Sequence, residues 1–189
     1  GVDLVKLMAA AGRLPALIGH DIPSQIVKAG RRLDLHPRPA DFDAIRERAL
    51  AKTAGVSAFC FHYYWFAGKR LLERPIELVL ADPTLDFPFA LCWANENWSR
   101  RWDGREQDLL VGQQHSAEDD LAFIAHVARY LRDPRSLRVD GKPLLLVYQP
   151  GLLPDAKATA GRWRRWCREN GIGEIVLAYV QGFERPDPR

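Results

Sequence analysis

Four short apolar segments, separated by stretches with helical periodicity, constrain the fold of this chain more than any other feature. The apolar segments are residues 56–61, 87–93, 143–148 and 175–180. Runs of this length, bounded by turn residues, are typical of strands that are buried on both faces of a sheet. With helices between them the order is βαβαβαβ, which predicts an α/β fold with a parallel sheet and crossover helices.

The helical stretches have recognisable beginnings. Ser116 and Asp119 form a capping-box pattern, and the apolar residues from Leu121 to Leu131 then recur on one face, which predicts a long amphipathic helix. Helices are also predicted over residues 41–53, 69–81 and 154–169. Within the second of these, Pro75 must begin a new helical segment or kink the helix.

Two architectures are compatible with this order of elements. An open doubly wound sheet would be complete with the four strands, whereas a TIM-type barrel normally needs about 250 residues and eight strands. No Gly-x-Gly-x-x-Gly motif follows any of the strands, and Gly68-Lys69 lacks the remainder of a P-loop. The open sheet therefore has little independent support, although element order alone is compatible with both.

Composition and charge narrow the classes of function. The chain has 189 residues, of which 47% are hydrophobic and 27% charged, as in an ordinary globular domain. The net charge of +3 is too small to indicate a nucleic-acid partner. The basic cluster RWRRWCR spans 162–168, but Trp163 and Trp166 share one helical face and are expected to pack on the sheet. No nucleic-acid partner is predicted, and the oligomeric state is not indicated.

The cysteines and the apolar runs indicate the cellular compartment of the protein. Cys60, Cys92 and Cys167 form neither a disulfide framework nor a metal-ligand spacing. A reducing, cytoplasmic compartment is therefore predicted, with no metal and no cofactor. No run approaches the length of a membrane span, and the N-terminus has no signal-peptide pattern.

The stretch FPFALCWANENWSRRWDG, residues 87–104, changes abruptly from apolar to polar. Large aromatic side chains beside amides, carboxylates and guanidinium groups are typical of a ligand site at the end of a strand. A saccharide uses both kinds of group, because its C–H faces lie on aromatic rings and its hydroxyls pair with polar side chains. In the alternative interpretation, Trp93 and Trp98 are core residues and Glu96 forms a salt bridge with Arg100 or Arg101.

Aromatic and amide side chains also follow the other predicted strands. Ligands bind at the C-terminal ends of parallel strands in both architectures. The predicted substrate-binding residues at these ends are His62, Tyr63, Tyr64, Trp65, Trp93, Asn95, Asn97, Trp98, Arg101, Trp102, Asp103, Tyr148, Gln149 and Gln181. His115 and His126 are expected at the surface.

Three blocks of the sequence resemble the WbsX-type glycosyltransferase family, which is related to the family 99 glycoside hydrolases. The blocks are FHYYWFAGKRLLERP, WANENWSRRWDG and GKPLLLVYQP, and the resemblance runs from about His20 to Gly182. It implies a single truncated domain, residues 1–189, that forms an incomplete (β/α) TIM-type barrel, roughly its N-terminal half to two-thirds. It also implies action on glycosidic bonds, by transfer or hydrolysis, in bacterial cell-surface polysaccharide or O-antigen metabolism, with an oligosaccharide or polysaccharide as partner.

Glu96 is the predicted catalytic residue. Glycosidic bond cleavage usually needs two carboxyl groups, and Asp103 is the only nearby candidate for the second, although it can equally cap the turn at Gly104. The family 99 hydrolases carry a second glutamate where this chain has Ser99. Desolvation by the tryptophans would favour a general acid at Glu96, and the neighbouring arginines would favour a base or nucleophile.

Several alternatives stay open. The chain could be a carbohydrate-binding domain without catalysis, in which Glu96 only accepts hydrogen bonds, or an inactive fragment of such an enzyme. His62 could act in acid–base chemistry or be a satisfied core histidine. Lys69 and Arg70 could contact an anionic sugar or phosphate, or lie in solvent at the start of a helix.

Overall fold

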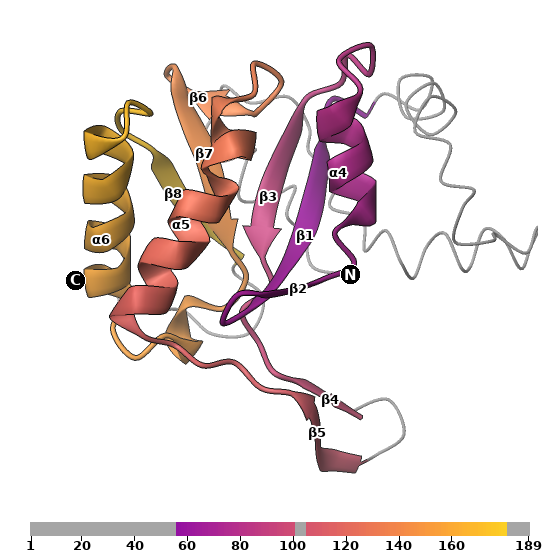
Figure 1. Ribbon diagram of the computed structural model, residues 1–189, viewed down its shortest axis with the longest axis vertical. Helices are drawn as coiled ribbons and strands as arrows, with labels where there is room; N and C mark the ends of the chain where they lie inside the picture. Colours follow the sequence, from indigo (N-terminus) through magenta and orange to yellow (C-terminus); the bar gives the residue numbers. More distant parts are fainter. Residues whose placement is uncertain (1–55, 101–104, 181–189) are drawn as a thin grey trace, which may run out of the picture.

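The computed structural model describes residues 56–100 and 105–180 of the chain (Figure 1). Several predictions concern residues outside these ranges. They are the helix over 41–53 and the candidate site residues Arg101, Trp102, Asp103 and Gln181.

A six-stranded sheet forms the centre of the described part. Its parallel strands lie side by side in chain order and are β1 (Phe59–Phe66), β3 (Phe89–Trp93), β7 (Lys142–Val147) and β8 (Val176–Tyr179). Two short antiparallel strands, β2 (Lys69–Leu71) and β6 (Arg138–Val139), form hairpins with β1 and β7. The predicted parallel sheet is confirmed.

The crossover segments contain α4 (Arg74–Ala81), α5 (Ala117–Arg132) and α6 (Ala156–Glu169), and a 3-10 turn, η2 (Pro150–Leu152), follows β7. The serine half of the capping-box pattern is confirmed, because Ser116 Oγ accepts the backbone N–H of Asp119 at 3.0 Å, whereas the Asp119 carboxylate accepts from the Trp65 indole instead. No described helix is long and apolar enough to cross a membrane.

The prediction of one helix over 69–81 is wrong in its first half. Ala67 and Gly68 have φ values of 45° and 89° and make a two-residue turn that pairs Phe66 with Lys69. Turns of two residues in hairpins need such left-handed backbone, so the chain returns along β1 as β2. Pro75 then lies in the first turn of α4, where its missing N–H leaves no helical bond unmade.

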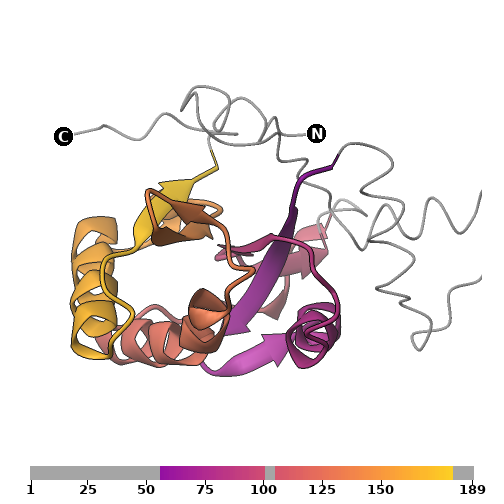
Figure 2. The same ribbon diagram turned by 90° about the horizontal axis from the view of Figure 1, so that it is seen from above.

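The described helices all cover one face of the sheet (Figure 2). The main core lies on that face and draws buried side chains from each of them, for example Ile76, Phe123 and Trp163. The opposite face has a second, smaller core of strand residues, to which no described helix contributes. A doubly wound sheet carries helices on both faces. In the part of the chain that the structure describes, the second face carries none of the helices that a doubly wound sheet would place there.

A two-stranded hairpin projects from the C-terminal edge of the parallel strands (Figure 1). It consists of β4 (Trp98–Arg100) and β5 (Arg105–Val111), paired antiparallel with irregular register. The extended conformation predicted for residues 109–111 is confirmed, and Leu109 and Leu110 on this hairpin are exposed. The hairpin begins at Trp98, the last residue of the WANENW segment (residues 93–98), and extends from the edge where ligands bind in parallel folds.

Candidate functional site

The face of the sheet without described helices, which we call the open face, receives two of the four polar or aromatic residues predicted after the first strand. β1 continues through His62 and Tyr64 to Phe66. Because successive side chains of a strand point to opposite faces, His62 and Tyr64 share the open face with Cys60. Tyr63 and Trp65 point to the helices instead.

Tyr63, Trp65 and Trp93 are core residues, which corrects the prediction that they line the site. Trp93 is fully buried and stacks on Phe123 with ring centroids 4.6 Å apart. The indole of Trp65 donates to Asp119 Oδ1 at 2.8 Å, beneath α5. For Trp93, the alternative interpretation as a core residue is the one that holds.

On the open face, aromatic rings from different strands approach one another over small side chains. The rings of His62 on β1 and Tyr148 after β7 have centroids 5.4 Å apart, although β3 lies between their strands. β3 contributes Cys92 to this face, and a side chain of this size leaves room for the two rings to meet. Tyr64 lies on the same side, and its ring centroid is 6.3 Å from that of His62.

The hairpin adds Trp98 to these rings. Trp98 packs edge-on against Tyr64 and Phe66, at centroid distances of 5.0 Å and 6.0 Å, and it is half-buried. The side chain of Asn97 accepts the backbone N–H of Gln113 at 2.7 Å, which ties the two ends of the hairpin together. The structure therefore gives Asn97 a local structural contact, whereas the sequence predicted ligand binding.

Asn95 and Glu96 both contact Gln149, the second residue after β7. The Asn95 amide is fully buried and makes two hydrogen bonds with the backbone of Gln149. Its Nδ2 donates to the Gln149 carbonyl at 2.7 Å, and its Oδ1 accepts the Gln149 N–H at 2.8 Å. The half-buried Glu96 accepts the side-chain amide of Gln149 at 3.0 Å through Oε2. These contacts hold the WANENW segment against the end of β7.

The C-terminal edge of the open face therefore combines a carboxylate, an amide and several aromatic rings. Glu96, Gln149, His62, Tyr64, Tyr148 and Trp98 are the predicted site residues that the structure brings to this region. In the described part of the chain, no three His, Cys, Asp or Glu side chains form a group that could hold a metal ion. The arrangement can stack on a flat apolar surface and hydrogen-bond to hydroxyl groups.

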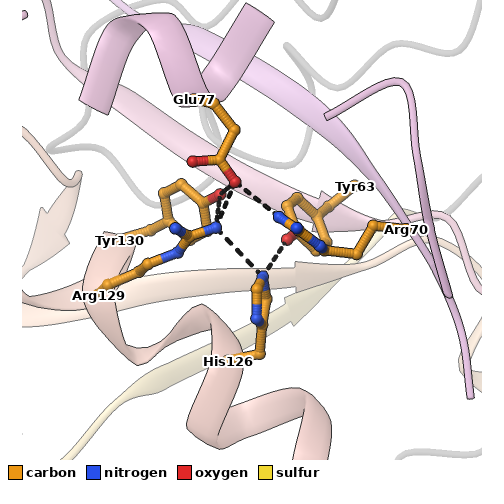
Figure 3. Close-up of polar contacts among 6 residues, drawn as sticks. All are labelled: Tyr63, Arg70, Glu77, His126, Arg129 and Tyr130. Atoms are coloured by element: carbon orange, nitrogen blue, oxygen red, sulfur yellow. Dashed lines mark hydrogen bonds and ion pairs between the residues drawn. The ribbon is translucent and has the colours of Figure 1, made fainter. Parts of the chain in front are cut away.

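A separate polar cluster lies on the helix side, between β1, β2, α4 and α5 (Figure 3). Glu77 accepts hydrogen bonds from Arg70 at 2.8 Å, from Tyr130 at 3.0 Å and from Arg129. Arg70 therefore belongs to an ion pair that joins β2 to α4, which corrects its expected place in solvent at the start of a helix. The cluster fastens helices to the sheet at a distance from the open face.

Both histidines that were expected at the surface are half-buried. His126 Nε2 lies 2.6 Å from Tyr63 Oη, and burial together with the charges of Arg129 and Arg70 lowers its pKa. His115 packs edge-on against Trp93 at 5.6 Å, and burial lowers its pKa as well. The expectation is wrong because His126 packs against the rings of Tyr63 and Trp65 on β1, and His115 packs against Trp93 on β3.

Comparison with protein-family models identifies the family of this chain. A family model described as Glycosyltransferase WbsX matches residues 40–189. This chain belongs to the WbsX glycosyltransferase family. The match includes β1, the WANENW segment and β7, so the whole cluster on the open face lies within the WbsX region.

Two relatives from Xanthomonas campestris pv. campestris, strains B100 and ATCC 33913, carry the description "Uncharacterized protein WxcX". Each is 67% identical to this chain over 148 residues, which cover 78% of this chain and 21% of the relative. The WbsX chain thus spans about a fifth of the length of these curated relatives. A solved structure described as a glycoside hydrolase-like protein shares the fold, with a TM-score of 0.53 and 18% identity over 74% of this chain and 44% of the other.

Two residues that were not predicted make hydrogen bonds with residues that the sequence assigned to the site. Gln113 donates to Asn97, and Asp119 accepts from Trp65. Asp119 was recognised only as part of a helix cap, and no local pattern indicated a partner 54 residues away. Gln113 lies in a polar segment between β5 and α5, where an amide has no distinguishing signal.

Proposed function

We propose that this chain is part of a carbohydrate-active enzyme that forms or cleaves glycosidic bonds, with Glu96 as a catalytic carboxylate. The observation that carries the proposal is the position of Glu96. It follows β3 at the carboxyl edge of a parallel sheet and accepts a hydrogen bond from Gln149. Ligands of parallel α/β folds bind at this edge, and membership in a glycosyltransferase family supports the same chemistry.

The proposed substrate is an oligosaccharide or polysaccharide. Its sugar rings would lie against the aromatic side chains of Tyr64, Trp98 and Tyr148, while Glu96 and His62 would meet its hydroxyl groups or its glycosidic oxygen. We extend the proposal to bacterial cell-surface polysaccharide, including O-antigen, because the similar relatives come from a bacterium. Asp103, seven positions after Glu96 in the sequence and outside the described residues, is the proposed candidate for a second carboxyl group.

We also propose that the parallel strands belong to a (β/α) TIM-type barrel, completed by strands elsewhere in the full-length protein. Three observations support this. The strands follow chain order, the described helices cover only one face, and the chain corresponds to 21% of its similar relatives. In such a barrel the open face would be the interior, and Glu96 would lie at its catalytic mouth.

Replacing Glu96 by Gln in the full-length protein tests the proposed function. Loss of a catalytic acid or base costs typically about 10²–10⁴-fold in rate, so turnover of labelled oligosaccharides should fall by this amount. Binding of the same oligosaccharide, measured by isothermal titration calorimetry, should change only a few-fold, since Gln has nearly the same shape. Glu169→Gln, at an exposed position at the end of α6, is the matched control.

The assay also separates the non-catalytic alternative. A panel of bacterial surface-polysaccharide fragments is first screened for conversion by the unaltered protein. If the unaltered protein binds a fragment and never converts any, the chain is a binding domain. If Glu96→Gln converts the fragment as fast as the unaltered protein, Glu96 is not catalytic and the proposed function fails.

A further inference from the structure

The contacts between the WANENW segment and Gln149 suggest that two predicted ligand-binding residues have another task. Asn95 and Gln149 both carry amides of the kind that recognise sugar hydroxyls. Asn95, however, is fully buried, and its amide oxygen and nitrogen both bond to the backbone of Gln149. Such an amide acts as a clamp between the ends of β3 and β7.

The clamp fixes the residue that touches Glu96. Gln149 lies between Tyr148, whose N–H bonds to the carbonyl of Trp93, and the 3-10 turn η2. Both backbone groups of Gln149 are held by Asn95, so its side chain starts from a defined position. From there its Nε2 donates to Glu96 Oε2 at 3.0 Å. Since Asn95 and Glu96 are consecutive, the three residues form a closed ring of contacts between two strand ends.

The direction of this hydrogen bond has a chemical consequence. A side-chain NH₂ group can only donate, and a donor facing a carboxylate oxygen stabilises its ionised form relative to its protonated form. The titratable groups that the described residues bring to this face include His62 and Tyr64 on β1, Tyr148 after β7, and the buried thiols of Cys60 and Cys92. The Gln149 amide is thus a donor that orients the Glu96 carboxylate.

We propose that Gln149 is a positioning residue that holds the Glu96 carboxylate in orientation and charge, and that Asn95 acts one step further out by clamping Gln149. This inference rests on the proposed function, since it assumes that Glu96 is catalytic. It assigns both amides to the enzyme's internal geometry and removes them from the set of residues that contact the saccharide.

The test uses the full-length protein and a labelled surface-polysaccharide fragment that the unaltered protein converts. In Gln149→Glu a second carboxyl group faces Glu96, and like charges at this distance disfavour ionisation. The acidic limb of the kcat/KM profile should therefore move to higher pH, by about one unit or more. Gln149→Leu, which removes the donor, should lower kcat by about tenfold with little change in KM.

Gln114→Glu introduces the same charge at an exposed position between β5 and α5 and should leave the profile unchanged. If Gln149 instead binds the saccharide, Gln149→Leu will raise KM and leave both kcat and the acidic limb in place, which would overturn the inference. Asn95→Asp should resemble Gln149→Leu. If it fails to fold, the profile of Gln149→Glu still decides. The Glu96→Gln variant distinguishes failure of the proposed function from failure of the positioning role. Normal turnover in Glu96→Gln refutes the proposed function, whereas an unmoved acidic limb in Gln149→Glu refutes only the positioning role.

Discussion

Replacing tryptophan by phenylalanine should mainly lower stability at Trp93 and mainly lower saccharide affinity at Trp98. Trp93→Phe removes one ring from a side chain that is fully buried between Phe123 and Trp163. The lost ring leaves a cavity of about 40 Å³, which costs about 1 kcal/mol at roughly 24 cal/mol per Å³. The lost apolar burial adds about 1 kcal/mol more. We therefore expect the free energy of unfolding to fall by about 2 kcal/mol.

Trp98→Phe is the matched variant on the hairpin. Trp98 is half-buried and contacts Tyr64 and Phe66 through ring edges. The loss of stability should stay below about 1 kcal/mol. If Trp98 stacks on a sugar, weakening a contact worth about 0.5–1.5 kcal/mol should lower saccharide affinity about two- to tenfold.

Urea unfolding followed by circular dichroism gives the stabilities, and isothermal titration calorimetry with a converted saccharide fragment gives the affinities. The expected pattern is a destabilised Trp93→Phe that keeps its affinity and a stable Trp98→Phe that loses it. A weakened affinity in Trp93→Phe with full stability would refute the assignment of Trp93 to the core and of Trp98 to the site.

Three further outcomes follow from contacts on the helix side of the sheet. The pKa of His126 is lowered by burial and by nearby arginines. As pH falls, the imidazole is therefore protonated at a higher pH in the unfolded chain than in the folded one, so the free energy of unfolding should fall below about pH 6.5. Urea unfolding at several pH values should show this loss, and His126→Gln should make the dependence of stability on pH less steep. Asp120 is buried and accepts a hydrogen bond from Arg162 Nε at 2.7 Å, which joins α5 to α6. Asp120→Asn should lower the free energy of unfolding by about 2–3 kcal/mol in a denaturant titration. This is less than for a fully buried pair, because Arg162 is partly exposed. Ser116→Ala removes the cap of α5 and should lower stability by about 1 kcal/mol in the same titration.

The parts of the fold that depend on local pattern were predictable. The apolar run before Trp93 and the Ser116 cap each depend on a few adjacent residues, and both appear where expected. The end of β1 was not predictable, because His62 to Trp65 resembles a polar loop as well as it resembles a strand. Because β1 continues through these residues, successive side chains alternate between the two faces of the sheet, and Tyr63 and Trp65 point to the helix side. This alternation explains why two predicted site residues belong to the core.

The contacts that organise the site are non-local, and sequence patterns carry little information about them. Asn95 and Gln149 are 54 residues apart, and their pairing depends on β3 and β7 being neighbours in the sheet. Before that adjacency is known, an asparagine beside a glutamate at a strand end is equally compatible with ligand binding and with a backbone clamp. The small size of Cys92 likewise acquires meaning only when His62 and Tyr148 are seen on either side of it.

A crystal structure of the full-length Glu96→Gln protein with a bound oligosaccharide tests the central claim most directly. We expect a sugar ring to stack on Tyr64, Trp98 or Tyr148, with the glycosidic oxygen or a reacting hydroxyl within about 3.2 Å of the residue 96 side chain. A saccharide bound away from the carboxyl edge of β1, β3 and β7, with the residue 96 side chain out of its reach, would contradict the account.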